Sequence, residues 1–300
     1  MTKISLIINV VDEELVYIND CLASVKGLDA EIILVDMTSS NELEAIAKSH
    51  KANRFPLKRV SHVEIARNFG IEKAKTGWIL ILDPDETLPK TLVKELNEIV
   101  ENPSADYFAL PRKNIIFGRW IKHARWWPDY NVRFFKKGSV GWAETIHSVP
   151  LTQGKGRDIQ ATEDHAITHN HYSTIDQYIT RLNRYTTVQA KEKIKDGYKF
   201  NWHDIIKRPT AEFVSRYFAG EGFKDGLHGL AICSLQGFSE LVVYLKIWQE
   251  TKFEPKELSV KHVIHQMKDA QGEVNYWQAD TLIKEGAGLA QRFKRKFKLH

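Results

Sequence analysis

Three short apolar runs in the first third of the chain predict buried β-strands. The runs at Ile4–Val11, Glu31–Val35 and Trp78–Leu82 do not alternate between polar and apolar residues, which is typical of strands covered on both faces in a parallel sheet. Helical patterns lie between them, at Tyr17–Val25 and Ile65–Lys75. This alternation predicts an α/β domain with a doubly wound sheet.

The rest of the chain is expected to be more helical. A helix is predicted at 88–100, with Pro89 in its first turn, and a long helix at Ile175–Lys195. Tyr107–Arg112 between them is strand-like, and the Gly-rich stretch "TQGKGRD" predicts a loop. The final hundred residues are helical in character and end in the basic stretch "RFKRKFKLH".

Composition narrows the class of protein only slightly. The 300 residues include 43 Lys and Arg against 38 Asp and Glu, and this net charge of +5 fits anionic lipids or phosphates without requiring nucleic acid. The two cysteines, Cys21 and Cys233, have no C-x-x-C partner, so a reducing compartment is expected. Asp12 interrupts the first apolar run, which therefore predicts a strand rather than a signal peptide. We expect a cytoplasmic protein.

Acidic residues follow all three predicted strands. Asp12, Glu13 and Glu14 follow the first strand, Asp36 follows the second, and the segment "DPDE" at 83–86 follows the third. Ligands of open α/β sheets bind beyond the carboxyl ends of the strands, so these carboxylates are predicted to gather at a binding site. The chain has neither a G-x-G-x-x-G after its first strand nor a G-x-x-x-x-G-K-[ST], which argues against a dinucleotide site and a P-loop.

The third acidic segment has the spacing of a metal site. Pro84 separates Asp83 from Asp85 and favours extended backbone at Asp83, and side chains at i and i+2 of an extended segment point the same way. Two carboxylates at this spacing suit a hard divalent cation, Mg²⁺ or Mn²⁺, that is shared with substrate phosphates. We therefore expect both carboxylates to face one cation.

Several segments together resemble bacterial family-2 glycosyltransferases of the GT-A fold. The stretch "IARNFGIEKAKTGWILILDPDE" resembles the block that these enzymes carry between their third helix and their D-x-D strand, and "SLIINVVDEE" and "EIILVDMTSSNE" resemble their first two strands. The segment "GRWIKHARWWPDYNVRFFKKG" is similar to the acceptor side of the branch that includes lipopolysaccharide-core and other cell-envelope transferases. The resemblance covers about residues 3–250 and implies a GT-A (Rossmann-like) catalytic domain with a C-terminal helical extension.

The resemblance implies a site for a UDP- or GDP-linked sugar donor. Glu13 and Asp36 match the carboxylates that hold the base and ribose, and Arg67 with Asn68 matches the segment beside the nucleotide and its diphosphate. The D-x-D segment matches the ligands of the metal ion that bridges the diphosphate. Such a cation would neutralise charge on the departing nucleoside diphosphate, and the guanidinium of Arg67 can hold phosphate.

Two positions depart from the family pattern, and one of them concerns the catalytic base. Met37 follows Asp36 where a small or acidic residue is usual, and Ser148 follows His147 where this branch commonly has glutamate. The second departure leaves the identity of the base open.

Inverting transfer requires a carboxylate that accepts the proton of the acceptor hydroxyl. Asp129 in "WWPDYNVR" and Glu144 in "WAETIH" are the candidates on the acceptor side. Asp129 is preferred, because Trp126, Trp127 and Tyr130 flank it and partial burial would raise the pKa of its carboxyl group. The alternative is that each carboxylate forms an ion pair with Arg125, Arg133 or a nearby Lys.

The histidine-rich stretch "HAITHNHYS" offers further metal ligands. His165, Ile167, His169 and His171 are predicted to share one face of a strand. Several GT-A enzymes complete their metal site with a late histidine, so the resemblance implies His169 or His171 as a ligand. A structural role for these histidines is the alternative.

The acceptor-side segment is also rich in aromatic and basic residues. Its aromatic side chains can stack on sugars and its cations can meet a lipid-linked phosphate; they are Trp120, Trp126, Trp127, Tyr130 and Trp142, interleaved with Arg119, Lys122, Arg125 and Arg133. Single-stranded nucleic acid can bind such a surface by base stacking. No nucleic-acid-binding signature accompanies the segment, so we expect no nucleic-acid partner. Core packing is the remaining alternative for some of these side chains.

The C-terminal stretch Leu227–Trp248 predicts an amphipathic helix. Four polar residues interrupt it: His228, Gln236, Glu240 and Lys246. Its apolar residues recur at helical spacing: Leu227, Ala231, Leu235, Phe238, Val242 and Leu245. The helix is therefore not expected to span a membrane. We expect it to pack on the catalytic domain or to lie at a membrane interface, where "RFKRKFK" would be attracted to anionic headgroups.

We interpret the chain as a metal-dependent, inverting glycosyltransferase. It would move a sugar from a nucleotide diphosphate donor to an envelope saccharide or lipid-linked acceptor, with peripheral contact to the inner face of the plasma membrane. In this interpretation residues 1–110 bind the nucleotide sugar, 111–200 complete the same catalytic domain on the acceptor side, and 201–300 form a helical, amphipathic region. The alternatives are a nucleotidyltransferase with the same acidic metal site and a non-catalytic module that binds saccharide or RNA.

Overall fold

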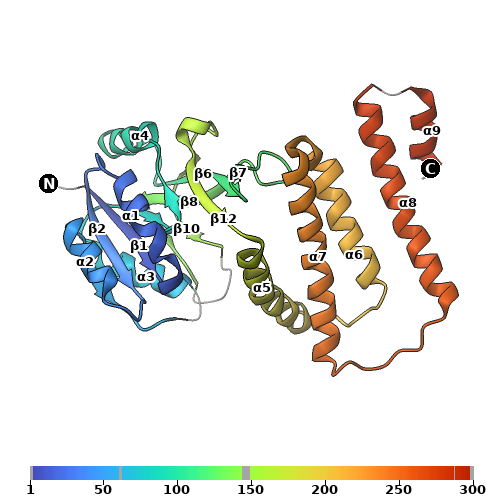
Figure 1. Cartoon of the computed structure of the whole chain (residues 1–300). Helices are drawn as coiled ribbons and strands as arrows, with labels where there is room; N and C mark the ends of the chain where they lie inside the picture. Colours follow the sequence, from blue (N-terminus) through green and yellow to red (C-terminus); the bar gives the residue numbers. More distant parts are fainter. Residues whose placement is uncertain (1–2, 61–62, 144–148, 287, 298–300) are drawn as a thin grey trace. The chain divides into compact units, whose positions relative to one another are not determined.

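The chain folds into two compact units. The computed structural model describes residues 3–60, 63–143, 149–286 and 288–297. The first unit comprises residues 1–115 and 128–171, and the second comprises residues 116–127 and 172–300. Figure 1 shows a sheet with flanking helices in the first unit and long helices in the second. The boundaries predicted near residues 110 and 200 stay a prediction.

The first unit is an α/β domain, as the sequence predicts. In chain order its strands are β1 (Ile4–Val10), β2 (Ala30–Asp36), β3 (Asn53–Pro56), β4 (Trp78–Leu82), β5 (Glu86–Thr87), β6 (Tyr107–Ile116), β8 (Asp129–Lys136), β9 (Val140–Gly141), β10 (Leu151–Thr152), β11 (Gly156–Asp158) and β12 (Ile167–Tyr172). Its helices are η1 (Asp12–Glu14), α1 (Leu15–Ser24), α2 (Glu42–Ser49), α3 (Val63–Lys73), α4 (Lys90–Glu101) and η2 (Glu163–His165).

The main sheet is parallel in its first half and mixed beyond it. The strand order is β3-β2-β1-β4-β8-β6-β12-β5. The strands β3, β2, β1 and β4 are parallel neighbours, whereas β8 pairs antiparallel with both β4 and β6. The stretch "TQGKGRD", predicted as a loop, contributes to β10 and β11, because its backbone pairs with β9 and β6. The expected parallel arrangement thus holds for β3, β2, β1 and β4, and acidic residues end or follow three of these strands, β1, β2 and β4.

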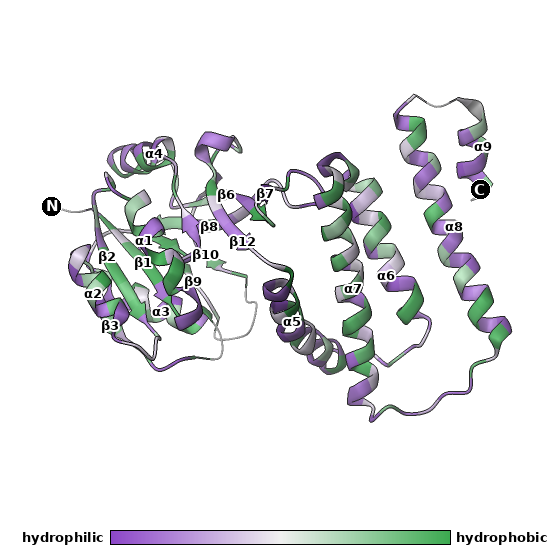
Figure 2. Ribbon diagram, viewed as in Figure 1, coloured by the Kyte–Doolittle hydropathy of each residue, from purple (hydrophilic) through white to green (hydrophobic). Residues whose placement is uncertain are grey.

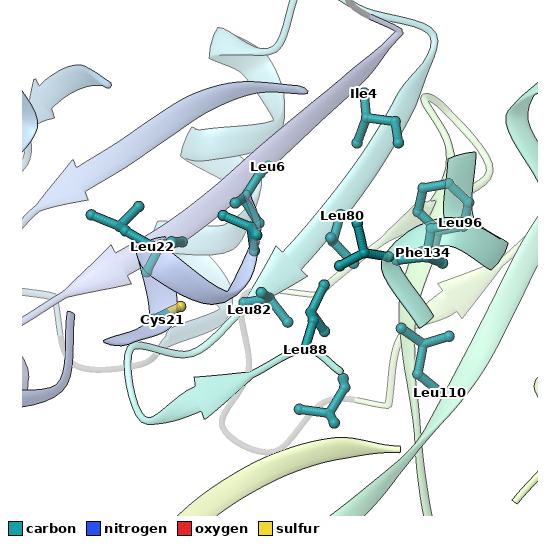
Figure 3. Close-up of a cluster of buried hydrophobic side chains, with 14 of the residues drawn as sticks. Ile4, Leu6, Cys21, Leu22, Leu80, Leu82, Leu88, Leu96, Leu110 and Phe134 are labelled. Atoms are coloured by element: carbon teal, nitrogen blue, oxygen red, sulfur yellow. The ribbon is translucent and has the colours of Figure 1, made fainter. Parts of the chain in front are cut away.

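Helices cover both faces of this sheet. All seven residues of β1 are buried, and Figure 2 shows the apolar colour along β1 and β2. Ile4, Leu6 and Ile8 enter a cluster with residues of α1 and α4 (Figure 3), while Ile7 enters a second cluster with residues of α3. The first strand is apolar without interruption because it is covered on both faces, as predicted, and its alternate side chains face two different cores.

Gly70 lets α3 approach the sheet closely. A Cβ atom at Gly70 would lie 2.4 Å from Cγ2 of Ile7 and 3.1 Å from Cγ2 of Val35. This close approach holds the first turns of α3, with Arg67, near the carboxyl ends of β1 and β2.

Gly70→Ala is expected to destabilise the fold, although alanine favours helix by about 1 kcal/mol over glycine. The added methyl group would overpack the core at Ile7, which typically costs about 1–3 kcal/mol. Denaturant unfolding of the variant measures the change in the free energy of unfolding. Gly77→Ala is the matched control, because nothing lies within 4 Å of a Cβ atom there. A Gly70→Ala protein as stable as the unmodified chain would contradict the close approach.

The second unit is almost wholly helical in its described residues. It contains the short strand β7 (Arg119–Trp120) and the helices α5 (Ile175–Lys195), α6 (Asp204–Val214), η3 (Ser215–Ala219), η4 (Gly222–Asp225), α7 (Gly226–Glu250), α8 (Val260–Lys284) and α9 (Leu289–Phe297). The predicted helix at Ile175–Lys195 coincides with α5, and the predicted amphipathic helix corresponds to α7. One helical stretch of the described residues, Gly222–Glu250, is long and apolar enough to cross a membrane by length and composition.

The face of α7 that is buried differs from the predicted face. Several members of the predicted apolar stripe are exposed, including Leu227, 77% of which is accessible, Phe238 and Leu245. The buried face instead carries Ile232, Cys233, Val243, Tyr244 and Ile247 together with two glycines. A Cβ atom at Gly229 would lie 1.8 Å from a carbonyl oxygen of η4, and one at Gly237 would lie 3.0 Å from a carbonyl oxygen of α6. The spacing of apolar residues did not predict which face of α7 is buried, because glycines allow the neighbouring backbones to come close on that face.

Candidate active site

The acidic segment after β4 forms a tight turn, called the acidic turn (residues 83–86). The carbonyl oxygen of Asp83 accepts a hydrogen bond from the backbone N–H of Glu86 at 3.0 Å, and Oε2 of Glu86 accepts from the Asp83 N–H at 2.9 Å. Pro84 occupies the second position, where turns favour proline. The prediction of an extended segment is therefore wrong, and the side chains of Asp83 and Asp85 have different neighbours.

Two arginines hold the Asp83 carboxylate. Nη2 of Arg67, from α3, lies 3.4 Å from Oδ1, and Nη2 of Arg133, from β8, lies 2.5 Å from Oδ2. Burial by itself raises the pKa of Asp83, but the positive charges of Arg133 and Arg67 outweigh burial and lower this pKa below its usual range. Asp83 therefore carries a negative charge at neutral pH.

Glu86 is the buried centre of this charge cluster. Its Oε1 accepts from Nη2 of Arg133 at 2.8 Å and from Nη1 of Arg112 at 3.2 Å, and the residue is fully buried. Arg133 is only 3% exposed; burial lowers its pKa, but Asp83 and Glu86 raise it above the ordinary value. The expectation that Arg133 meets a lipid-linked phosphate is wrong, because two carboxylates hold it inside the domain.

Asp85 lies beside His169 of β12, and His169 contacts His171. Oδ2 of Asp85 is 3.6 Å from Nε2 of His169, and both side chains are buried. The rings of His169 and His171 are 4.5 Å apart between centroids. The prediction that these two histidines share a strand face is confirmed, whereas His165 lies in η2 before the strand.

Asn114 fixes the orientation of His169. Its Nδ2 donates to Oδ2 of Asp129 at 3.0 Å, so its Oδ1, 2.7 Å from Nδ1 of His169, is placed to accept the Nδ1–H. The other ring nitrogen, Nε2, lies 3.3 Å from Nδ1 of His171 and 3.6 Å from Oδ2 of Asp85. Histidines that bind metals are commonly oriented in this way through their other nitrogen.

Asp129 is held as an ion-pair partner. Its Oδ2 accepts from Nη2 and Nε of Arg112 at 2.7 and 2.9 Å, and its Oδ1 accepts from Nδ2 of Asn131 at 3.1 Å. Burial raises the pKa of Asp129, but Arg112 and the amide donors lower it overall. The expected rise in pKa is therefore wrong. Asp129 does form an ion pair, as the alternative predicts, but its partner is Arg112 and not Arg125, Arg133 or a lysine. Glu144, the other candidate base, lies outside the described residues.

Asp36 and Glu13 lie at the carboxyl ends of the first two strands, as predicted. Asp36 is buried at the end of β2, where its Oδ1 accepts from the N–H and hydroxyl of Thr38 at 2.8 and 2.7 Å, and its Oδ2 accepts from Nε of Arg54 at 2.5 Å. Burial raises the pKa of Asp36, but these donors lower it overall. Glu13 is exposed and forms a bidentate pair with Arg59 at 2.9 and 3.1 Å.

Asn68 binds the protein backbone. Its Nδ2 donates to the carbonyl oxygen of Trp142 at 2.8 Å, and its Oδ1 accepts from the Trp142 N–H at 3.2 Å. The indole ring of Trp142 lies 5.4 Å from the guanidinium carbon of Arg67, within the range of a cation–π contact. The carboxamide of Asn68 therefore fixes a residue that contacts Arg67.

Three side chains around the acidic turn carry buried polar atoms that have no hydrogen-bond partner among the described residues. They are both amide atoms of Asn9, Nε of Arg67, and Nε and Nη1 of Arg133. Asn9 follows Ile8, which lies opposite Leu82 of β4, so Asn9 stands next to the start of the acidic turn. Such groups are uncommon in native proteins and call for an explanation.

The aromatic residues predicted for the acceptor side fall in both units. In the second unit, Trp120 and Trp127 pack edge to face with centroids 5.1 Å apart. In the first unit, Trp142 is part of the hydrophobic core, and the hydroxyl of Tyr130 donates to the carbonyl oxygen of Ile159 at 3.0 Å. Core packing is thus confirmed for Trp142 in the first unit and for Trp126 in the second, and saccharide binding by the others stays a prediction.

Sequence reasoning assigned no role to several residues that build this site. These residues are Asn9, Arg112, Asn114 and Glu86. In the sequence, Glu86 stands out only as the neighbour of the D-x-D pair. A signal existed for some of them, because a polar residue inside an apolar strand run, such as Asn9 in "ISLIINV", is seldom buried without a partner. The part of the chain that the structure describes contains no group of three or more His, Cys, Asp and Glu side chains placed to hold a metal ion.

Comparisons with known proteins agree on one family. A model of glycosyl transferase family 2 matches residues 5–153, a range that includes the acidic turn. An uncharacterized glycosyltransferase of Rickettsia felis is 26% identical over 256 residues, which cover 82% of this chain and 90% of that protein. The lipopolysaccharide core biosynthesis glycosyltransferase LpsC of Rhizobium meliloti is 22% identical over 231 residues, 75% of this chain and 81% of that protein.

Solved structures with a similar chain course include two complexes with nucleotide ligands. Mannosyltransferase PcManGT from Pyrobaculum calidifontis, in complex with GDP-Man and Mn²⁺, has a TM-score of 0.47 and 12% identity, and the match covers 99% of this chain and 88% of that chain. S. aureus TarS 1–349 in complex with UDP has a TM-score of 0.44 and 11% identity, covering 86% of this chain and 94% of that chain. Likenesses this distant say nothing of what the present chain binds.

The family match and the architecture agree with each other. The matched range contains the parallel strands β1 to β4, the acidic turn and the antiparallel strand β8, and the relatives extend the similarity over most of the chain. The predicted GT-A class with a C-terminal helical region is confirmed. Residues 5–153 therefore belong to glycosyl transferase family 2, and the protein is a glycosyltransferase.

Proposed function

We propose that this glycosyltransferase takes its sugar from a nucleotide diphosphate donor, bound where β1, β2 and β4 end. The observation that carries the proposal is the set of unpartnered buried polar atoms on Asn9, Arg67 and Arg133 in the described part of the chain. Leaving a buried donor unsatisfied costs about 1–3 kcal/mol. A ligand rich in oxygen acceptors, such as a diphosphate, would satisfy the guanidinium group of Arg67, whose side chain is partly exposed, while Arg133 holds Asp83 from inside the domain.

The base and ribose would lie at the ends of β1 and β2. Asp36 is ionised, buried and held rigidly by Thr38 and Arg54, which suits a group that accepts hydrogen bonds from a base or ribose. Glu13 is on the same edge, and we assign it to the ribose. Asn68, predicted beside the nucleotide, is assigned a positioning role, because both ends of its carboxamide bind Trp142.

We propose that Mg²⁺ or Mn²⁺ is held at the acidic turn by Asp85 and His169, with Asp83 and His171 next to them. The donor set fits, because an imidazole nitrogen and a carboxylate oxygen, Nε2 of His169 and Oδ2 of Asp85, lie 3.6 Å apart. These cations commonly take few protein ligands and complete their shell with water and substrate phosphates. When bound, the cation would neutralise the charge that develops on the leaving nucleoside diphosphate.

The reaction that we propose is an inverting transfer, which needs a carboxylate base on the acceptor side. Asp129 is ionised, but its oxygens accept from Arg112, Asn114 and Asn131. Its lowered pKa makes it a weak base. We therefore assign Asp129 to positioning Asn114, and Glu144 remains the candidate base from the sequence.

The acceptor that we propose is an envelope saccharide or a lipid-linked saccharide, reached from the cytoplasmic face of the plasma membrane. Support comes from the resemblance of the acceptor-side segment to cell-envelope transferases and from the name of one relative, a lipopolysaccharide core biosynthesis glycosyltransferase.

Incubation with a panel of UDP- and GDP-linked sugars and Mn²⁺ tests the proposed reaction. We expect slow, cation-dependent release of free sugar and free nucleoside diphosphate from one member of the panel, because water can replace the acceptor. Heat-treated protein and addition of a chelator are the controls. Release of pyrophosphate would instead indicate a nucleotidyltransferase. Absence of any cation-dependent product across the panel, with and without added saccharide acceptors, would favour a non-catalytic binding module.

A further inference from the structure

The C-terminal helix α9 exposes two phenyl rings and two cations on one side. Phe293 and Phe297 are 59% and 51% exposed, and their ring centroids are 4.6 Å apart. Arg292 and Lys296 are exposed as well. Each pair is separated by four residues, so its members lie one turn apart on the same side of the helix. We call these four residues the basic-aromatic face.

The opposite side of α9 is fixed to α8 by an ion pair. Arg295 lies 2.7 Å from Oδ1 of Asp280, and Lys284 lies 3.0 Å from Oδ2 of the same carboxylate. Asp280 is buried and has both oxygens engaged. Within residues 288–297 and the described remainder of the chain, no carboxylate forms an ion pair with Arg292 or Lys296, so their charges are not neutralised.

This combination is typical of helices that lie in a membrane interface. The sequence of α9, "LAQRFKRKF", contains four basic residues and no acidic one. Basic side chains of such helices meet anionic headgroups while aromatic side chains enter the boundary with the acyl chains. A solvated basic helix has no need of two exposed phenyl rings, because exposed apolar area is unfavourable in water.

The ring geometry favours lipid over nucleic acid as the partner. Single-stranded nucleic acids bind by stacking successive bases on separate aromatic faces. Phe293 and Phe297 contact each other at an interplanar angle of 50°, and they therefore form one continuous apolar ridge. The aliphatic stems of Arg292 and Lys296 can extend along this ridge while their charged ends reach the headgroups.

We propose that the basic-aromatic face of α9 binds an anionic phospholipid surface. This proposal adds a partner, the phospholipid surface, to the proposed function. It rests on the proposed function in one respect, because a lipid-linked acceptor would be presented at that surface. The binding surface itself lies in the second unit and shares no residue with the donor site in the first unit.

Vesicle co-sedimentation with the full chain tests this proposal. We expect the protein to bind vesicles of phosphatidylcholine with about one third phosphatidylglycerol, and to bind pure phosphatidylcholine vesicles much more weakly, because each basic residue near an anionic surface adds to the attraction. Arg292→Glu with Lys296→Glu should lower the partition coefficient about 30-fold or more. Phe293→Ser with Phe297→Ser, which leaves the charge unchanged, should lower it about tenfold.

The matched control is Lys195→Glu with Lys199→Glu, which makes the same charge change at two other exposed lysines of the second unit. It should change the partition coefficient less than about threefold. An equal loss in this control, or equal binding to charged and neutral vesicles, would overturn the proposal, as would binding of a single-stranded oligonucleotide in preference to vesicles. Binding of UDP or GDP with Mn²⁺ is measured on the same variants. The α9 variants should retain nucleotide binding, so this measurement separates a loss of vesicle binding from a failure of the donor site.

Discussion

Asp85→Asn is expected to lower cation-dependent turnover about 100-fold or more, because a Lewis-acid contact is worth several kcal/mol and about 1.4 kcal/mol is a factor of ten in rate. The amide has nearly the shape of the carboxylate but lacks the charge that holds a divalent cation. Asp85 is buried next to His169, so the substitution removes a charge without removing volume. Turnover of the nucleotide sugar and its dependence on the Mn²⁺ concentration are the measurements.

Asp20→Asn is the matched control, since Asp20 lies exposed on α1 and the chemical change is the same. It should leave both turnover and cation dependence unaltered. Thermal unfolding of both variants checks that the fold is retained. If Asp85→Asn kept an unchanged Mn²⁺ dependence, the cation would have to be held elsewhere.

Arg133→Met is expected to destabilise the fold by about 3–5 kcal/mol, the usual cost of removing one partner of a buried ion pair. Arg133 is shared by Asp83 and Glu86, so its loss leaves a fully buried glutamate with Arg112 alone and removes the nearest cation of Asp83. Denaturant unfolding gives the free energy of unfolding of each protein. Arg157→Met is the control, because Arg157 is exposed and its guanidinium group donates a hydrogen bond to the hydroxyl of Ser104.

The destabilisation has an expected pH dependence. Arg133 lowers the pKa of Asp83 in the folded state, so the stability from this pair is fully present above the pKa of an unfolded aspartate, about 3.9. It is lost as pH falls below that value toward the folded pKa. The difference between the unmodified protein and Arg133→Met should therefore shrink below about pH 4. A difference that stays constant down to pH 2 would contradict the ion-pair explanation.

The elements of the sheet could be predicted because their side chains obey simple periodicities. The apolar run Trp78–Leu82 is a strand with the predicted bounds, and Ile175–Lys195 is a helix with the predicted bounds. The buried face of α7 could not be predicted in this way. Its position depends on close backbone contacts at Gly229 and Gly237, which a hydrophobic pattern does not record.

The sequence predicted where the site lies in the fold, but it predicted only some of the contacts among its side chains. The strand-end positions of Asp36 and the acidic turn follow from the rule that parallel strands present their carboxyl ends at one edge. The partners of the acidic turn, Arg112 and Arg133, come from strands that are distant in sequence, and a single sequence does not reveal antiparallel register. The pKa of Asp129 was predicted with the wrong sign for the same reason, since its neighbour Arg112 lies across the β6–β8 pairing.

Titration calorimetry of UDP and GDP against the unmodified protein, with and without Mn²⁺, tests the donor site most directly. We predict that one nucleotide binds measurably and that Mn²⁺ tightens its Kd about tenfold or more, because the cation would bridge the acidic turn and the diphosphate. No detectable heat with either nucleotide, or the same Kd with the cation and with a chelator, would contradict a cation-assisted diphosphate site at the acidic turn.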